Sequence, residues 1–289
     1  MEKKMGIIER KLQEIGESLL VTLPKAWTKM AKLKRGSRVQ LRTTPEGFLI
    51  VAPEISIPSM HTQCSLAYDA LFARRFFREY FKGHEQITVI FQDPDVQQHQ
   101  LVHAFLNRFM NVQVIEENAR KMTVKCFKIQ ELSIIECLKR MHHLCVSMFE
   151  PSADHEQVDI TIAKFYYLLI MQTRRYIDEG RFAEENQIPL IRALDVRMVA
   201  EKIERIADIL KGTARDRDVA KAKAYYTRVF DAFLFEEYEK AIKLYNEGRS
   251  VVEYYSTRSA AAKTKEEYAR FDGMRALNQW ILEISMLVR

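Results

Sequence analysis

The stretch RKLQEIGESLLVTLPKAW, residues 10–27, determines the fold of the N-terminal part of the chain. Its aliphatic run at residues 19–23 predicts a strand, which Pro24 ends because proline cannot donate to a strand ladder. Pro24 also suits the first turn of a helix, and the sequence predicts that helix over residues 25–33. A mixed polar and apolar run at residues 7–15 predicts a preceding strand. The N-terminal part of the chain is therefore predicted to form short strands around one short helix.

A second pair of strands is predicted downstream. Apolar and polar residues alternate over residues 38–42, which is the period of a half-buried strand with Arg38 and Arg42 on its outer face. An apolar run at residues 48–51 predicts its neighbour. Because these fifty residues hold few large apolar side chains, we expect two chains to intertwine and complete one core.

Positive charge is concentrated in the same region. The 289-residue chain has a net charge of +6, and residues 1–52 hold eleven basic and five acidic residues, so the remainder is balanced. This asymmetry indicates a polyanionic partner for the N-terminal module alone. The alternative is a solvated basic surface that keeps the protein soluble. The candidate contacts to a nucleic acid are Arg10, Lys11, Lys25, Arg35, Arg38 and Arg42.

The rest of the chain predicts a small mixed layer followed by helices. After a linker at residues 53–65, a helix, a strand, a helix and two strands give an αβαββ layer that ends near residue 127. Six helices follow, with breaks at Gly180, Pro189, Gly212 and Gly248. They are predicted at about residues 133–149, 155–179, 190–211, 219–246, 251–264 and 265–288. We expect an α+β, multidomain fold with domains at 1–53, 54–130 and 131–289.

Several classes of function find no support. The sequence has no Walker A segment, no GxGxxG, no HExxH and no Glu-x-x-His pair, so we do not expect an enzyme. The four cysteines form no CxxC pair, which predicts a reduced, cytoplasmic protein. No 18-residue apolar run and no signal-peptide pattern occurs, so we expect neither secretion nor membrane insertion. His142 and His143 diverge by about 100° on a helix, which predicts structural or solvated roles rather than one shared ion.

Residues 10–27, together with LKRGSRVQL at residues 33–41, resemble AbrB/SpoVT/MazE-like swapped-hairpin DNA-binding domains. They are most similar to the archaeal proteins that fuse such a domain to PhoU. The resemblance covers about 45 residues and implies a homodimer with an interlocked, β-rich face that binds double-stranded DNA. It puts Arg10, Lys11 and Lys25 at motif positions of the family. Arg35, Arg38 and Arg42 are candidates because of their charge and the period of the strand, and not because of the resemblance.

Later segments resemble the rest of those fusions. YFKGHEQITVI at residues 80–90 and NVQVIEEN at 111–118 are similar to their middle region. LSIIECLKRMHHLCVSMFE at 132–150 and VRMVAEKIERIADIL at 196–210 resemble helices of a PhoU repeat. This resemblance implies a PhoU-like all-α bundle. It also implies that the Glu-x-x-x-Asp motif at Glu204 and Asp208 has the metal-binding role associated with it in that family.

Helical geometry is consistent with a surface metal site there. Glu201, Glu204 and Asp208 lie opposite the apolar stripe of their helix, where mutual repulsion could be offset by a divalent or ferric ion. Such a site needs ligands from a second helix, and Glu156 and Asp159 are the candidates. Ordinary ion pairs with neighbouring arginines are the alternative. The last helix has no Glu-x-x-x-Asp, so at most one site is expected.

The resemblance as a whole implies a homodimeric transcriptional regulator in the control of phosphate uptake. The N-terminal domain would bind DNA, and the bundle would respond to a partner or a metal. The alternative is a PhoU-type adaptor that contacts a phosphate transporter component or a sensor kinase without binding DNA.

Overall fold

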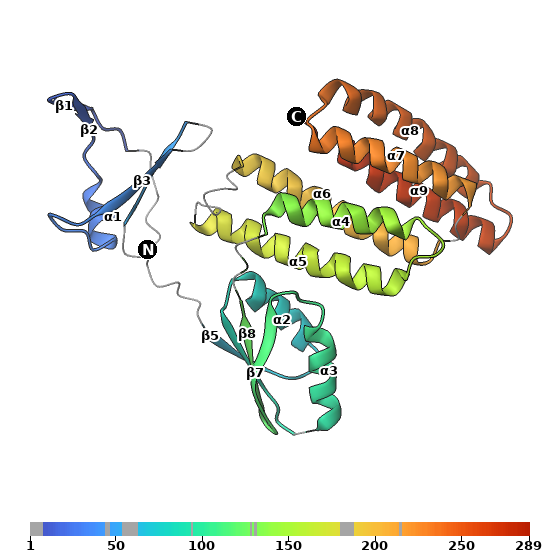
Figure 1. The fold of residues 1–289 in the computed structure, drawn as a ribbon, viewed down its shortest axis with the longest axis horizontal. Coiled ribbons are helices and arrows are strands. Elements are labelled where there is room, and N and C mark those ends of the chain that lie inside the picture. Colours follow the sequence, from blue (N-terminus) through green and yellow to red (C-terminus); the bar gives the residue numbers. More distant parts are fainter. Residues whose placement is uncertain are drawn as a thin grey trace. The chain divides into compact units, whose positions relative to one another are not determined.

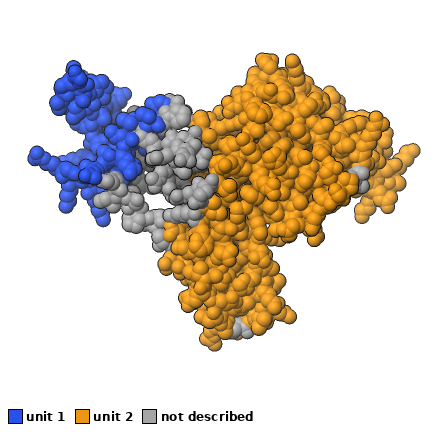
Figure 2. All heavy atoms as spheres, viewed as in Figure 1, with its two compact units in different colours: residues 1–60 blue, residues 61–289 orange. Residues whose placement is uncertain are grey.

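The computed structural model describes residues 8–43, 47–53, 63–93, 95–127, 129, 132–179, 188–213 and 216–289 (Figure 1). The chain divides into two compact units, Met1–Met60 and His61–Arg289 (Figure 2). Strands and helices both contribute, which confirms the α+β prediction. Among the described residues, no helix combines the length and the apolar character needed to cross a bilayer.

The described residues of the first unit form two hairpins and one short helix. Strands β1 (Gln13–Ile15) and β2 (Ser18–Leu20) pair antiparallel, and the turn between them needs the positive φ of Gly16. Helix α1 (Lys25–Met30) follows, and then β3 (Val39–Thr43) pairs antiparallel with β4 (Leu49–Pro53).

All the predicted elements of this unit are present, but β1, β2 and α1 are shorter than predicted, and β2 ends at Leu20 rather than at residue 23. Helix α1 ends at Met30 rather than at residue 33, because Lys32 adopts a left-handed conformation with φ 54°. Strand β1 starts at Gln13 rather than at residue 7. The half-buried strand expected at residues 38–42 is not half-buried within one chain, since Leu41 is 64% exposed.

The second unit begins with a four-stranded sheet. Its elements are β5 (Gln63–Ala67), α2 (Phe72–Phe81), β6 (Gln86–Ile90), α3 (Val96–Leu106), β7 (Val112–Asn118) and β8 (Lys121–Cys126). The strand order is β5-β6-β8-β7, with β5 parallel to β6 and the other pairs antiparallel. The predicted αβαββ layer is therefore βαβαββ. The first strand was missed because it is a five-residue edge strand with one fully buried side chain, Leu66.

An aromatic cluster joins this layer to the helices that follow. Phe76, Phe77, Phe105 and Phe109 come from α2, α3 and the turn after α3. Tyr167 of α5 (His155–Glu179) packs against two of them, with ring centroids 5.0 Å from Phe77 and 5.4 Å from Phe109. Sheet layer and helices therefore share one core rather than forming separate cores.

The remaining helices of the described residues pack in two groups of three, which can be followed in Figure 1. The first group is α4 (Ile134–Met148), α5 and α6 (Leu190–Lys211). The second group is α7 (Arg217–Leu234), α8 (Tyr238–Ala260) and α9 (Lys265–Ser285). Helices α6 and α9 pack against each other and connect the two groups.

One helix boundary differs from the prediction. The sequence predicts helices at residues 219–246 and 251–264. In the structure the chain instead breaks at residues 235–237, between α7 and α8, where Glu236 has a φ of 56°. Gly248 lies inside the continuous helix α8 instead of ending one. The glycine is present for packing rather than for chain reversal, because the side chain of Tyr225 fills the space beside it.

Candidate functional site

The predicted nucleic-acid contacts lie on the surface of the first unit. Arg10 and Lys11 precede β1, Lys25 begins α1, and Arg35 and Arg38 come just before β3. All five side chains are exposed. Arg42 is in β3, paired with Ile50, and its side chain lies outside the described residues. The structure therefore leaves five of the six basic groups accessible to a polyanion.

Two of these basic residues take part in local hydrogen bonds. The guanidinium of Arg10 donates a hydrogen bond to the backbone oxygen of Glu9, 3.1 Å away, rather than to a carboxylate. Pro24 precedes Lys25, and the Lys25 carbonyl accepts from the hydroxyl of Thr28 at 3.2 Å. The Lys25 side chain is thus presented by a turn of helix whose backbone is fixed.

The same unit exposes an unusual amount of apolar surface. None of the described residues 8–41, 43 and 47–53 is buried. Large apolar side chains of both hairpins and their flanks are exposed by more than a third: Ile8, Leu12, Ile15, Leu19, Leu20, Val21, Met30, Leu41, Phe48, Leu49 and Ile50. Burying one such side chain is worth about 1.5–3 kcal/mol. A single chain therefore leaves the core of this unit incomplete.

A second group of candidates lies on the surface of α5 and α6. The pKa of Glu204 is raised by its burial first and then by the charge of Asp208, and the pKa of Asp208 is raised by burial and by Asp159. Asp159 itself accepts a hydrogen bond from Lys211 at 2.8 Å. Arg205 approaches Glu204 at 4.0 Å and Asp208 at 3.9 Å, at the outer limit of an ion pair. Negative charge here is only partly compensated.

The other two candidates are more peripheral. Glu201 adds to the rise in the pKa of Glu204 as its smallest contribution, and Glu156 is exposed near Lys211. The carboxylate oxygens of α5 and α6 do not converge on one point: of the described residues, the one group of three potential ligands within 4.8 Å lies elsewhere, at Cys64, Glu79 and His84. No sequence motif marks that group, because Cys64 and Glu79 are 15 residues apart and lie on different elements.

The buried cysteines and histidine have structural surroundings. Cys137 and Cys145 are fully buried on α4, and all four cysteines are free thiols. His142 is 8% exposed and stacks on Phe230 with ring centroids 3.8 Å apart, whereas His143 is exposed. The ring of His142 is thus packed in the core, whereas that of His143 faces solvent.

Comparison with known proteins assigns the first unit. Residues 12–59 match the family model for MazE, a bacterial antitoxin of antidote–toxin recognition. The match spans β1 to β4, so the predicted AbrB/SpoVT/MazE-like domain is confirmed there, and it is a domain of the type that DNA-binding regulators carry. No curated protein and no solved structure matches the chain.

Proposed function

We propose that this protein is a homodimeric, DNA-binding transcriptional regulator in the control of phosphate uptake. The observation that carries the proposal is the coincidence, within one unit, of the MazE-type match, the whole excess of positive charge and an uncovered apolar surface. The first unit contacts DNA, and the PhoU-like helical part receives the signal.

Dimerisation follows from the incomplete core. In a swapped arrangement the apolar faces of β1 to β4 would pack against those of a second copy, which removes them from water. The basic side chains lie in or just before the same short elements, so dimerisation would also double the number of cations on one surface. Two copies of Arg10, Lys11, Lys25 and Arg35 would suffice to neutralise several phosphates.

The helical part supports the proposal through its surface charge. A divalent or ferric ion at Glu204, Asp208 and Asp159 would relieve the repulsion that raises the pKa values of the first two. The exposed carboxylate of Asp208 would have to rotate toward the others, since the three do not converge. Glu201 and Glu156 would contribute from the margin of such a site.

The test measures how tightly the full-length protein binds its own promoter duplex and a scrambled duplex. Binding is measured by fluorescence anisotropy across a salt series. We expect tighter binding to the promoter and a linear fall of log affinity with log salt, at about 0.9 per phosphate contacted. Arg10→Ala and Lys25→Ala should each weaken binding and reduce that slope. Lys243→Ala removes an exposed lysine of α8 and serves as the matched control.

Two outcomes would count against DNA regulation. One is equal, weak binding of both duplexes that disappears at physiological salt, and the other is a slope that Arg10→Ala and Lys25→Ala leave unchanged. Either would favour the adaptor function, in which the first unit only dimerises the protein and the helical part contacts a transporter component or sensor kinase.

A further inference from the structure

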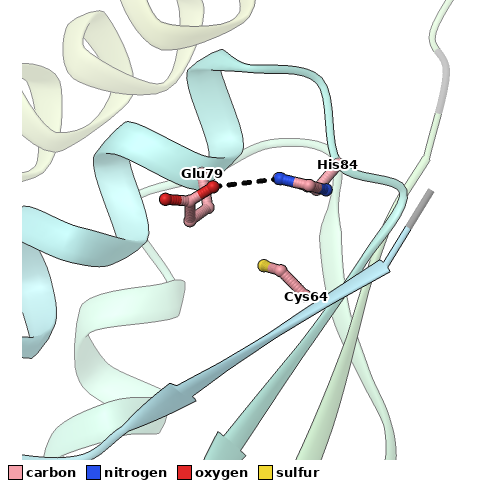
Figure 3. A group of neighbouring side chains, drawn as sticks. All are labelled: Cys64, Glu79 and His84. Carbon is pink, nitrogen blue, oxygen red and sulfur yellow. Dashed lines mark hydrogen bonds and ion pairs between the residues drawn. The ribbon is translucent and has the colours of Figure 1, made fainter. Parts of the chain in front are cut away.

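Three side chains of different ligand chemistry meet at the edge of the sheet (Figure 3). Cys64 comes from β5, Glu79 from α2, and His84 from the turn between α2 and β6. One ligand atom of each lies within 4.8 Å of the other two. Glu79 and His84 are 4% and 7% exposed, and Cys64 is partly buried. The group is thus enclosed rather than scattered over a surface.

Local structure fixes the three positions. Gly83 has a φ of 84°, and this turn brings His84 back beside the last part of α2, where its backbone N–H donates to the carbonyl of Glu79. Strand β5 runs parallel to β6 and sets Cys64 opposite Ile87. The turn positions His84, helix α2 positions Glu79, and the pairing of β5 with β6 positions Cys64. The backbone of three separate elements therefore holds the cluster together.

Hydrogen bonds orient the carboxylate of Glu79. His84 Nε2 donates to Oε2 at 3.0 Å, while Arg78 Nε donates to Oε1 at 2.6 Å. Lys82 Nζ lies 3.2 Å from Oε1 and 3.1 Å from Oε2. Burial, the largest single influence, acts to raise the pKa of Glu79, but the bonds from Lys82 and Arg78 together hold it below its usual value. Glu79 is therefore an anion at neutral pH.

We propose that Cys64 Sγ, Glu79 Oε2 and His84 Nε2 bind a zinc-class transition-metal ion. Thiolate, imidazole and carboxylate are the three protein ligands of Zn²⁺, which prefers four-coordinate tetrahedral sites. Bonds of about 2.0–2.3 Å to a tetrahedral ion put its ligand atoms somewhat under 4 Å apart. Nε2 and Oε2 are 3.0 Å apart and the ligand atoms of the group lie within 4.8 Å of one another, so they have to shift to reach that spacing. The sulfur ligand disfavours Mg²⁺ and Ca²⁺, and the fourth position is left for water or another small ligand.

Proton release accompanies this binding. Burial raises the pKa of the Cys64 thiol to about 11, with a further contribution from the charge of Glu79, so the thiol holds its proton until a metal displaces it. The proton on His84 Nε2 must also leave that nitrogen, because the lone pair there becomes the metal bond. The thiolate and the carboxylate together then balance the two charges of Zn²⁺, and no oxidation or reduction takes place.

The two cations around Glu79 have opposite roles in this site. Arg78 holds Oε1, the oxygen that the metal leaves free, and so orients the ligand from the outer shell. Lys82 bonds both oxygens, including Oε2, and so competes with the ion. Arg78→Gln should weaken metal binding by about 10- to 100-fold. Lys82→Gln should tighten it, on the order of tenfold, because it removes a like charge next to the ion.

The experiment uses the full-length protein, stripped with a chelator and titrated with Co²⁺ as a spectroscopic probe of the zinc site. We expect one thiolate-to-Co²⁺ charge-transfer band per chain, and its loss when Zn²⁺ is added. Cys64→Ser should abolish the band, and His84→Gln should weaken Co²⁺ binding more than about 100-fold, beyond the range of outer-shell changes. Cys137→Ala, in the buried face of α4, is the control that keeps the band.

The design separates this site from other metal binding and from loss of the fold. Ions held by the carboxylates of α5 and α6 give no thiolate band, so they cannot mimic the signal. Circular dichroism of each variant identifies any that fails to fold, and Lys82→Gln tests the site without removing a ligand. Absence of the band in the wild-type protein, or a band that persists in folded Cys64→Ser, would overturn the proposal.

Discussion

The side chain of Tyr225 in α7 occupies the space that a Cβ at position 248 of α8 would need. A Cβ built on Gly248 would overlap the Tyr225 hydroxyl and lie 2.9 Å from Leu282 Cδ1 of α9. The hydroxyl passes this point to donate a hydrogen bond to the carbonyl of Leu244 at 3.0 Å. The three helices of the second group therefore meet at a residue without a side chain.

Gly248→Ala should lower the free energy of unfolding by about 1–3 kcal/mol, as expected for overpacking. This effect opposes and exceeds the gain of about 1 kcal/mol in helix propensity. Gly273→Ala in α9 is the matched control, because a Cβ there meets nothing within 4 Å and should stabilise the protein. Urea denaturation measures both variants. Equal stabilisation by both would show that the packing at Tyr225 is unimportant.

Leu19→Asp and Leu41→Asp should dissociate the proposed dimer. These side chains are 67% and 64% exposed in one chain, and a charge in the shared core would be buried without a partner. We expect a monomer by sedimentation and a loss of promoter binding. Leu101→Asp, on α3 and 61% exposed, should change neither property. Retention of the dimer in both hairpin variants would contradict the swapped arrangement.

Asp208→Asn should stabilise the protein by a few tenths of a kcal/mol at about pH 7, because it removes a like charge four residues from Glu204. Both carboxyls have a raised pKa, so their ionisation costs stability in the folded state. This cost lowers the free energy of unfolding of the wild type only at pH values where the two groups are ionised. The advantage of the variant should therefore shrink as the pH falls through these raised values toward about 4. Denaturant titration of both proteins at the two pH values measures the difference.

Asp272→Asn provides the control for that experiment. Its carboxylate is paired with Arg275 at 2.8 Å, so the substitution should not stabilise the protein at either pH.

Added divalent ion should raise the midpoint of thermal unfolding of the wild type more than that of Asp208→Asn. If the wild type gains nothing from any divalent or ferric ion, the carboxylates of α5 and α6 are not a metal site.

His142 should make the protein sensitive to acid. Burial lowers its pKa from 6.5 to about 4, and His143 adds a smaller effect, so the unfolded chain takes up a proton that the folded chain refuses. Stability is lost as the pH falls from about 6.5 to about 4, by at most about 3 kcal/mol. His142→Gln should remove this part of the pH dependence. His143→Gln, on the exposed neighbour, should retain it when both are followed by denaturation across this range.

Local signals in the sequence predicted some elements well and others poorly. Helices α5 and α6 begin and end where they were predicted to, because their apolar periodicity is long and because Pro189 and Gly212 mark the two ends of α6. Strand β5 and the boundary between α7 and α8 were not predicted. The strand is short and at an edge, and the helix boundary depends on a left-handed Glu236 that no glycine or proline marks.

The candidate sites divide in the same way. The basic surface of the first unit could be predicted, because charge along short exposed elements is readable without a tertiary structure. The group of Cys64, Glu79 and His84 could not, because its members are separated in sequence and the strand that positions Cys64 was assigned to a linker. Only the pairing of β5 with β6 brings the thiol to the helix. The roles of the basic residues and of the carboxylates remain predictions.

The strand order of the sheet also determines when each strand can pair as the chain is synthesised. Among the described strands, β7 pairs with β8 alone and β8 lies between β7 and β6, so β7 has no partner in the sheet until residue 126 has left the ribosome. The aromatic cluster stays open for longer still, until Tyr167 of α5 arrives to cover Phe77 and Phe109. Phe77 and Phe109 therefore lack the cover of Tyr167 while some forty further residues are added to the chain, and exposed aromatic surface of this kind favours aggregation.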